Sequence, residues 1–150
     1  MKKYSLKKYL LVCLTLFSGV YSAGLSCHDL FGKTLGQPFY ATDVYHVTCT
    51  TDSGGASDYL ETSIIDTTQT TGGGKISAVT KGGGVVEQTG DPGRNDGNYS
   101  PPLLVHGGNG LYEVFVHKLN KGPKIYSLQY HCKSSGGAHT GTEIITIQNQ

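Results

Sequence analysis

The chain has 150 residues, a formal net charge of +1, 22 glycines and a single arginine, Arg94. This length suits one domain with a hydrophobic core. The nearly balanced charge argues against a nucleic-acid partner, because binding to a phosphate backbone depends on clustered lysine and arginine.

Residues 1–22 have the pattern of a secretory signal peptide. Four lysines lie among the first eight residues, an uncharged stretch follows to residue 21, and small residues stand near a cleavage site after Ser22. The apolar part is shorter than the roughly 20 residues of a membrane span. We expect a secreted or periplasmic protein in which residues 23–150 form a single domain without a membrane span.

Lipid attachment at Cys27 is the alternative to simple cleavage. A lipoprotein signal usually has its leucine one place earlier than Leu25 stands relative to this cysteine. We therefore favour ordinary cleavage and release.

The rest of the chain has the pattern of short strands. Runs rich in β-branched residues and tyrosine are separated by clusters of glycine, serine, threonine and asparagine, and no long run has helical periodicity. This predicts an all-β, jelly-roll-like antiparallel β-sandwich of about eight strands. The expected strands span residues 44–50, 59–66, 75–80, 85–89, 103–106, 111–118, 124–132 and 142–148.

The loop over residues 89–98 is the best candidate for a cation site. Asp91, Asn95 and Asp96 offer the carboxylate and amide oxygens that calcium prefers. The same residue types are typical of tight turns, and their spacing differs from the helix-loop-helix calcium pattern. We expect turn chemistry, with calcium as the alternative and no other cofactor.

Two neighbouring strand patterns predict a hairpin. Residues 111–118 and 124–132 are joined by five residues, and placing Val116 opposite Tyr126 gives one continuous apolar face. Glu113, His117 and Gln129 then fall on the opposite face.

Three cysteines remain after signal cleavage, in an oxidising compartment where two can pair. Cys49 and Cys132 each end an alternating run on the same face as buried-type neighbours, so both thiols are expected to point inward. We predict a disulfide between them, with a bond from Cys27 to either one as the alternative.

No spacing in the chain indicates a transition-metal site or a catalytic set. The six histidines (His28, His46, His106, His117, His131 and His139) show neither the i, i+4 helix spacing nor the i, i+2 strand spacing of common sites. The glycine clusters lack the context of a phosphate loop, and no Gly-x-Ser-x-Gly elbow surrounds Ser100 or Ser134. We expect surface histidines and no enzyme.

Three short segments carry a family resemblance. Residues 43–45 open a strand with Asp-Val-Tyr, residues 107–116 have the sequence Gly-Gly-Asn-Gly-Leu-Tyr-Glu-Val-Phe-Val, and residues 126–130 have the sequence Tyr-Ser-Leu-Gln-Tyr. Over about residues 42–132 the chain resembles the pre-peptidase C-terminal domain of bacterial exported proteins, and it also resembles small exported proteins of Gram-negative bacteria. The first resemblance implies a jelly-roll-like sandwich with an accessory role, sometimes with calcium or an extracellular polymer as ligand.

These observations favour an exported, non-catalytic binding or accessory module whose ligand is a protein or a polysaccharide. The alternative is a structural or assembly subunit, because the run over residues 142–147 could act as an edge strand that adds to a neighbour's sheet. A secreted hydrolase is the third hypothesis.

Overall fold

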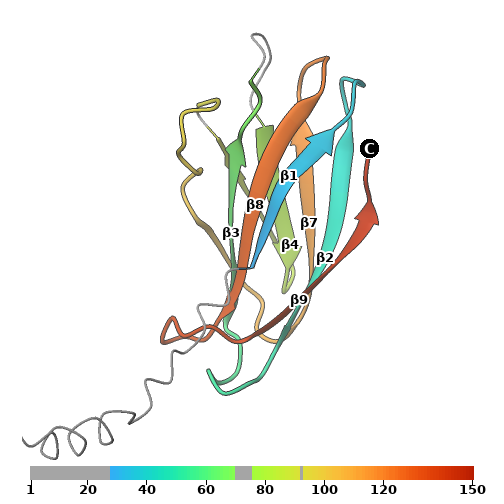
Figure 1. The fold of residues 1–150 in the computed structure, drawn as a ribbon. Coiled ribbons are helices and arrows are strands. Elements are labelled where there is room, and N and C mark those ends of the chain that lie inside the picture. The colour runs from blue at the N-terminus through green and yellow to red at the C-terminus, as the bar shows by residue number, and fades with distance from the viewer. Residues whose placement is uncertain (1–27, 70–75, 92) are drawn as a thin grey trace, which may run out of the picture.

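The computed structural model describes residues 28–69, 76–91 and 93–150, and all regular structure in these ranges is β-strand (Figure 1). The strands are β1 (Asp29–Leu35), β2 (Thr42–Thr50), β3 (Tyr59–Asp66), β4 (Ile76–Gly82), β5 (Val85–Gly90), β6 (Leu103–His106), β7 (Gly110–Lys118), β8 (Lys124–Lys133) and β9 (Gly141–Gln148). The predicted signal peptide and Cys27 lie outside the described residues.

The strands form two antiparallel sheets with nested pairing. One sheet has the order β1-β8-β3-β6 and the other the order β5-β4-β7-β2-β9. Within them β1 pairs with β8, β2 with β7, β3 with β6 and β4 with β5. This mirror pairing of the first four strands with the next four is the topology of a jelly roll. The predicted fold class is therefore confirmed.

Strands β1 and β9 both lie at sheet edges, but only β9 was predicted from the sequence. The unpredicted strand β1 contains Gly32 and has an irregular register between Leu30 and Lys33. Such an interrupted edge strand carries little of the alternation by which strands are recognised. β9 was expected, and it lies beside β2 as a ninth strand outside the mirror-paired eight.

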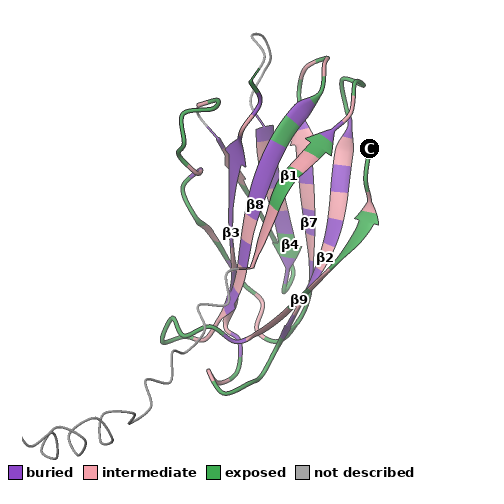
Figure 2. Ribbon diagram, viewed as in Figure 1, coloured by how far each residue is buried: buried purple, intermediate pink, exposed green. Residues whose placement is uncertain are grey.

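Alternating inward side chains of both sheets form the core. Figure 2 shows buried residues alternating with half-buried ones along β2 and β7. In β2 the residues Asp43, Tyr45, Val47 and Cys49 are buried, while the residues between them are half-buried. In β7 the buried residues are Tyr112, Val114, Val116 and Lys118. A strand with one face on the core and one outside has this period of two.

The disulfide Cys49–Cys132 joins the two sheets through the core. Its Cα atoms are 5.5 Å apart, and it closes a loop between residues 83 positions apart. β2 and β8 belong to different sheets, so the bond staples the sandwich across its layers. The predicted pairing is confirmed, and a disulfide fits an oxidising extracellular or periplasmic compartment.

The predicted hairpin of β7 and β8 is wrong. β7 pairs with β2 and β4, and β8 pairs with β1 and β3, so residues 119–123 carry the chain from one sheet to the other. The inward faces were predicted correctly, but they meet across the core instead of side by side. Alternation determines which side chains are buried, whereas it is blind to which strand is the neighbour.

A chain of polar side chains runs through the apolar core. Tyr126 Oη donates to Asp43 Oδ2 at 2.5 Å and lies 2.6 Å from Tyr45 Oη. The other oxygen of Asp43 accepts the backbone amide of Gln150, which follows β9. These contacts satisfy the buried carboxylate of Asp43 and both tyrosine hydroxyls, and they also hold the end of the chain in place.

No helix in the described ranges is long and apolar enough to cross a membrane.

Candidate functional site

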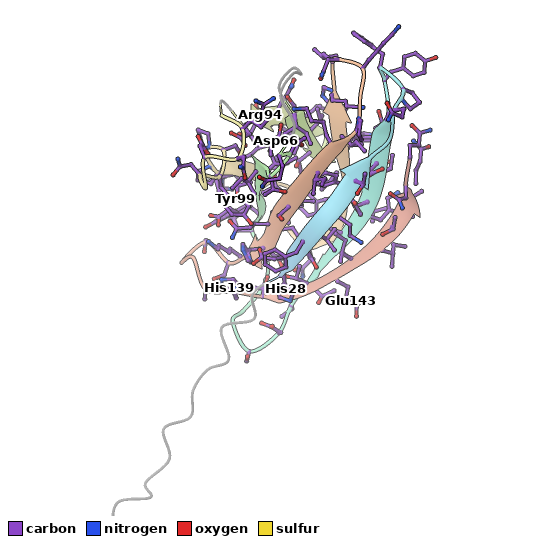
Figure 3. The ribbon with its side chains drawn as sticks, turned by 45° about the horizontal axis from the view of Figure 1, so that its top comes forward. His28, Asp66, Arg94, Tyr99, His139 and Glu143 are labelled. Carbon is purple, nitrogen blue, oxygen red and sulfur yellow. A yellow bond between two sulfur atoms is a disulfide. The ribbon has the colours of Figure 1, made fainter. Side chains whose placement is uncertain are left out.

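Three histidines from separate segments meet at one end of the sandwich. His28 directly precedes β1, and its backbone carbonyl accepts the amide of Tyr130 at 3.1 Å. His131 is on β8, and His139 lies in the connection from β8 to β9, where it forms a β-bridge with Lys133. Figure 3 shows His28 and His139 at the same end of the molecule.

The three side chains place one ligand nitrogen each within 4.8 Å of one another. The rings of His131 and His139 have centroids 4.9 Å apart, and those of His28 and His131 are 6.2 Å apart. His28 and His131 are half-buried and His139 is exposed. The Nδ1 atom of His131 is buried and has no hydrogen-bond partner within residues 28–69, 76–91 and 93–150.

Burial favours the neutral form of two of these imidazoles. Desolvation lowers the pKa of His28 and of His131, and the nearby His139 lowers both further. Neutral imidazole is the form that binds metal ions. The carboxylate of Asp29 acts in the opposite direction on both rings, because negative charge favours a cation there.

The sequence analysis missed this cluster because the contact is long-range. His28 approaches β8 only through the pairing of β1 with β8, and β1 was not predicted. His139 lies close to His131 because residues 134–138 make a tight turn. In this turn the amide of Ser134 donates a hydrogen bond to the carbonyl of Ala138 at 2.9 Å. A histidine eight residues beyond another, across a Gly-Gly turn, was the one local signal.

The other three histidines lie apart from this cluster. His46 Nε2 is 3.8 Å from Glu113 Oε1, and His106 Nδ1 is 3.0 Å from Asp58 Oδ2. His117 is half-buried on β7, and burial lowers its pKa. All three are at least partly exposed, and two of them lie beside a carboxylate. This agrees with the surface or hydrogen-bonded role expected from the sequence.

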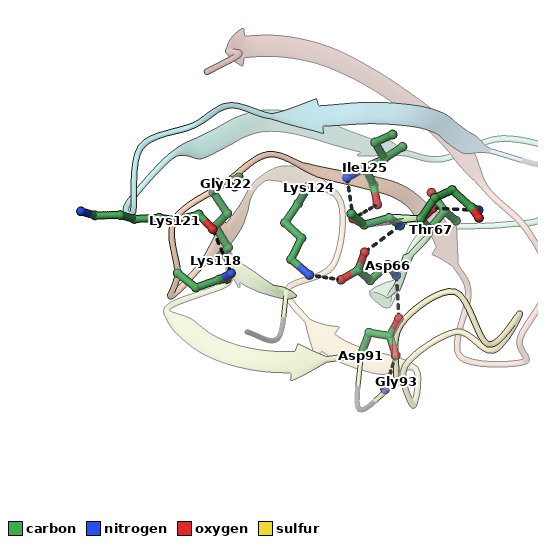
Figure 4. A network of polar contacts seen from close by, with 12 residues as sticks. Asp66, Thr67, Asp91, Gly93, Lys118, Lys121, Gly122, Lys124 and Ile125 are labelled. Carbon is green, nitrogen blue, oxygen red and sulfur yellow. Dashed lines mark hydrogen bonds and ion pairs between the residues drawn. The ribbon is translucent and has the colours of Figure 1, made fainter. Parts of the chain in front are cut away.

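The calcium candidate Asp91 belongs to a buried polar network (Figure 4). Its Oδ2 accepts the backbone amide of Asp66 at 2.6 Å, and its Oδ1 accepts the amide of Gly93 at 2.8 Å. Asp66 Oδ2 in turn pairs with Lys124 Nζ at 2.6 Å, and both side chains are almost fully buried. Asp91 thus holds the start of the 91–98 loop against the end of β3.

Asn95 and Asp96 lie exposed further along that loop. The side chain of Asn95 exchanges hydrogen bonds with that of Gln69, and Asp96 Oδ1 accepts the amide of Asn98 at 2.9 Å. An aspartate side chain that accepts the backbone amide two residues later forms an Asx turn, which aspartate favours. These contacts match the expected turn chemistry, and calcium binding stays a prediction.

Ser100 and two of the glutamates that a secreted hydrolase could use have structural partners. Ser100 is buried, and its Oγ accepts the amide of Ile64 at 3.0 Å. Glu61 pairs with Lys133 at 2.7 Å, and Glu113 pairs with Lys81 at 2.8 Å. Figure 3 shows another glutamate, Glu143, on the edge strand β9.

Strand β9 presents apolar side chains at the edge of the larger sheet. It pairs with β2, and none of the other strands in the described ranges pairs with its second side. Ile145 is 60% exposed and Ile147 is 50% exposed. Ile144 packs against the core instead, as alternation requires.

No protein-family model, curated protein or solved structure matches this chain. The resemblance to the pre-peptidase C-terminal domain therefore stays a prediction. A jelly roll agrees with it, but unrelated families share that architecture and differ in function. Any functional conclusion has to come from the chain's own surface.

Proposed function

We propose that this chain is an exported, non-catalytic binding or accessory module that engages a protein or polysaccharide ligand through its surface. The observation that supports this proposal is the open edge of β9 with its exposed isoleucines. An open edge presents unpaired amides and carbonyls to an extended segment, and alternate side chains give specificity. This feature favours a protein over a polysaccharide.

The other three edge strands carry features that discourage pairing. β6 has four residues and follows Pro101 and Pro102. β1 is irregular between Leu30 and Lys33, and β5 is short and carries Glu87. Short strands, proline, bulges and charges are the usual protections of a sheet edge. With eight residues β9 is the longest of these four edge strands, and it has no lysine or proline. It carries one charge at Glu143, and its register with β2 shifts between Val44 and Tyr45.

Both ends of β9 are fixed, which lowers the entropic cost of using it as a template. At its start, the amide of Thr140 donates to the carbonyl of Cys132 at 2.9 Å. Beyond its end, Gln150 donates its amide to Asp43, and its carbonyl accepts the amide of Gly36. The strand is therefore held rigid without help from a partner.

The test compares Ile145→Lys with Val86→Lys. Val86 is 59% exposed on β5, at the opposite edge of the same sheet, and it is a matched control for added surface charge. The purified protein is screened against exported proteins of its host and against a glycan array. We expect a specific ligand whose binding is lost in Ile145→Lys and kept in Val86→Lys. Absence of any binding at high concentration would refute the binding function, and equal loss in both variants would refute the role of β9.

A second candidate is a structural or assembly subunit, in which β9 adds to the sheet of another copy. The same open edge motivates it, because self-pairing uses identical backbone groups. Light scattering over a range of concentrations distinguishes the two. Assembly that grows with concentration and is abolished by Ile145→Lys supports this candidate, and a monomer at all concentrations opposes it.

A further inference from the structure

We propose that His28, His131 and His139 form a binding site for a divalent transition-metal cation of the Zn²⁺ class, held by three imidazole nitrogens. The site lies at the end of the sandwich where β8 leaves for β9, away from the exposed isoleucines. The metal site is therefore independent of the proposed binding function.

The geometry is close to what zinc requires. Three nitrogens bound tetrahedrally at about 2.0–2.1 Å from zinc lie about 3.3 Å from one another. The ligand atoms here lie within 4.8 Å, so closure needs only modest side-chain rotation. His139 is the exposed member, and we expect its side chain to make most of that movement.

The backbone under the site is already fixed. His131 directly precedes Cys132, which the disulfide ties to β2. His139 is bridged to Lys133, and the carbonyl of His28 accepts the amide of Tyr130. A ligand set on a rigid frame loses little conformational entropy when the ion binds.

The donor set selects the class of ion. Imidazole suits zinc, copper, iron and nickel, whereas calcium and magnesium require oxygen ligands. Three protein ligands leave the fourth tetrahedral position for water or for a group of another molecule. The Nδ1 atom of His131 is buried and has no hydrogen-bond partner among the described residues, so if this nitrogen is the ligand a bound cation would satisfy it.

Charged groups of both signs surround the three histidines. The carboxylates of Asp29 and Glu61 both act on His131. The ammonium of Lys133 opposes them, but it is 2.7 Å from the carboxylate of Glu61 and is largely neutralised by that pair.

The test is a zinc titration of the oxidised, untagged mature protein, followed by calorimetry and by thermal melting. We expect one equivalent of Zn²⁺ to bind and to raise the melting temperature, and EDTA to reverse the shift. His131→Ala and His139→Ala should each weaken binding at least tenfold. His46→Ala and His117→Ala are matched controls from the other sheet and should leave it unchanged.

The proposal is overturned by an absence of saturable zinc binding, by equal affinity in His139→Ala, or by loss of binding in the His117→Ala control. His139 is exposed in the connection from β8 to β9, so its variant is expected to fold even if His131→Ala does not. A Cys27→Ser variant must keep the site, because loss of binding there would show that a thiolate is required. Co²⁺ substitution adds a visible absorption band that reports imidazole ligation directly.

Discussion

The buried ion pair between Lys124 and Asp66 gives the sharpest stability prediction. The two side chains are 1% and 2% exposed, and Lys124 Nζ lies 2.6 Å from Asp66 Oδ2. In Lys124→Met the carboxylate of Asp66 stays buried with its amide contact from Thr68 but without its counter-charge. Removing one partner of a buried pair costs about 3–5 kcal/mol, because an uncompensated charge remains.

Two companion variants separate this effect from lost packing. In Lys124→Met/Asp66→Asn the charge is gone and an acceptor for Thr68 remains, so we expect most of the stability to return. Lys133→Met is the half-buried counterpart: its pair with Glu61 is similarly short at 2.7 Å, but the side chains are 18% and 24% exposed. Partial solvation screens that pair, and we expect a cost below about 1 kcal/mol.

Urea denaturation of the oxidised protein measures these differences from the midpoint and the slope of each curve. The reasoning is refuted if Lys124→Met costs no more than Lys133→Met. It is also refuted if the double variant is as unstable as the single one, because the loss would then come from side-chain packing instead of an unpaired charge.

Two further predictions concern the disulfide and the buried tyrosines. Replacing Cys49 and Cys132 by alanine should lower the free energy of unfolding by about 4.5 kcal/mol in the chain-entropy model, with Cys27→Ser as a near-neutral control; urea curves that superimpose would contradict this. Burial raises the pKa of Tyr45 to about 12 and raises the pKa of Tyr126 as well. A raised folded-state pKa means that stability is complete below the unfolded value of about 10 and is lost as pH rises from there towards 12. The absorbance of tyrosinate and the circular dichroism signal should therefore change together as the pH is raised. If all tyrosines ionise near pH 10 while the sandwich stays intact, the raised pKa of the buried tyrosines is disproved.

Much of the fold followed from the period of two along the chain. The expected strand over residues 59–66 coincides with β3, and that over residues 103–106 coincides with β6. The pairing of Cys49 with Cys132 was also predictable, since both end runs of inward side chains. Each of these inferences needs only local alternation and the pressure to bury apolar surface.

The candidate sites were less predictable. The sequence placed Asp91 in a loop, as a turn residue or a calcium ligand. Its carboxylate is instead buried and accepts the backbone amide of Asp66, the last residue of β3. The spacing of the histidines along the chain predicted no metal site, yet three of them meet in the structure. A separation in sequence says nothing about a contact between two paired strands. Hydrogen-bonded neighbours of a jelly roll are mostly far apart in sequence.

The sequence by itself determined that the chain is β-structured, which faces of its strands turn inward and which thiols meet. Tertiary structure alone decided that β7 and β8 lie in opposite sheets, that β9 ends the larger sheet with an open edge, and that His28 reaches His131 and His139. The reason is physical: side-chain alternation is a property of each strand, whereas the choice of neighbour depends on how two whole sheets close over a shared core.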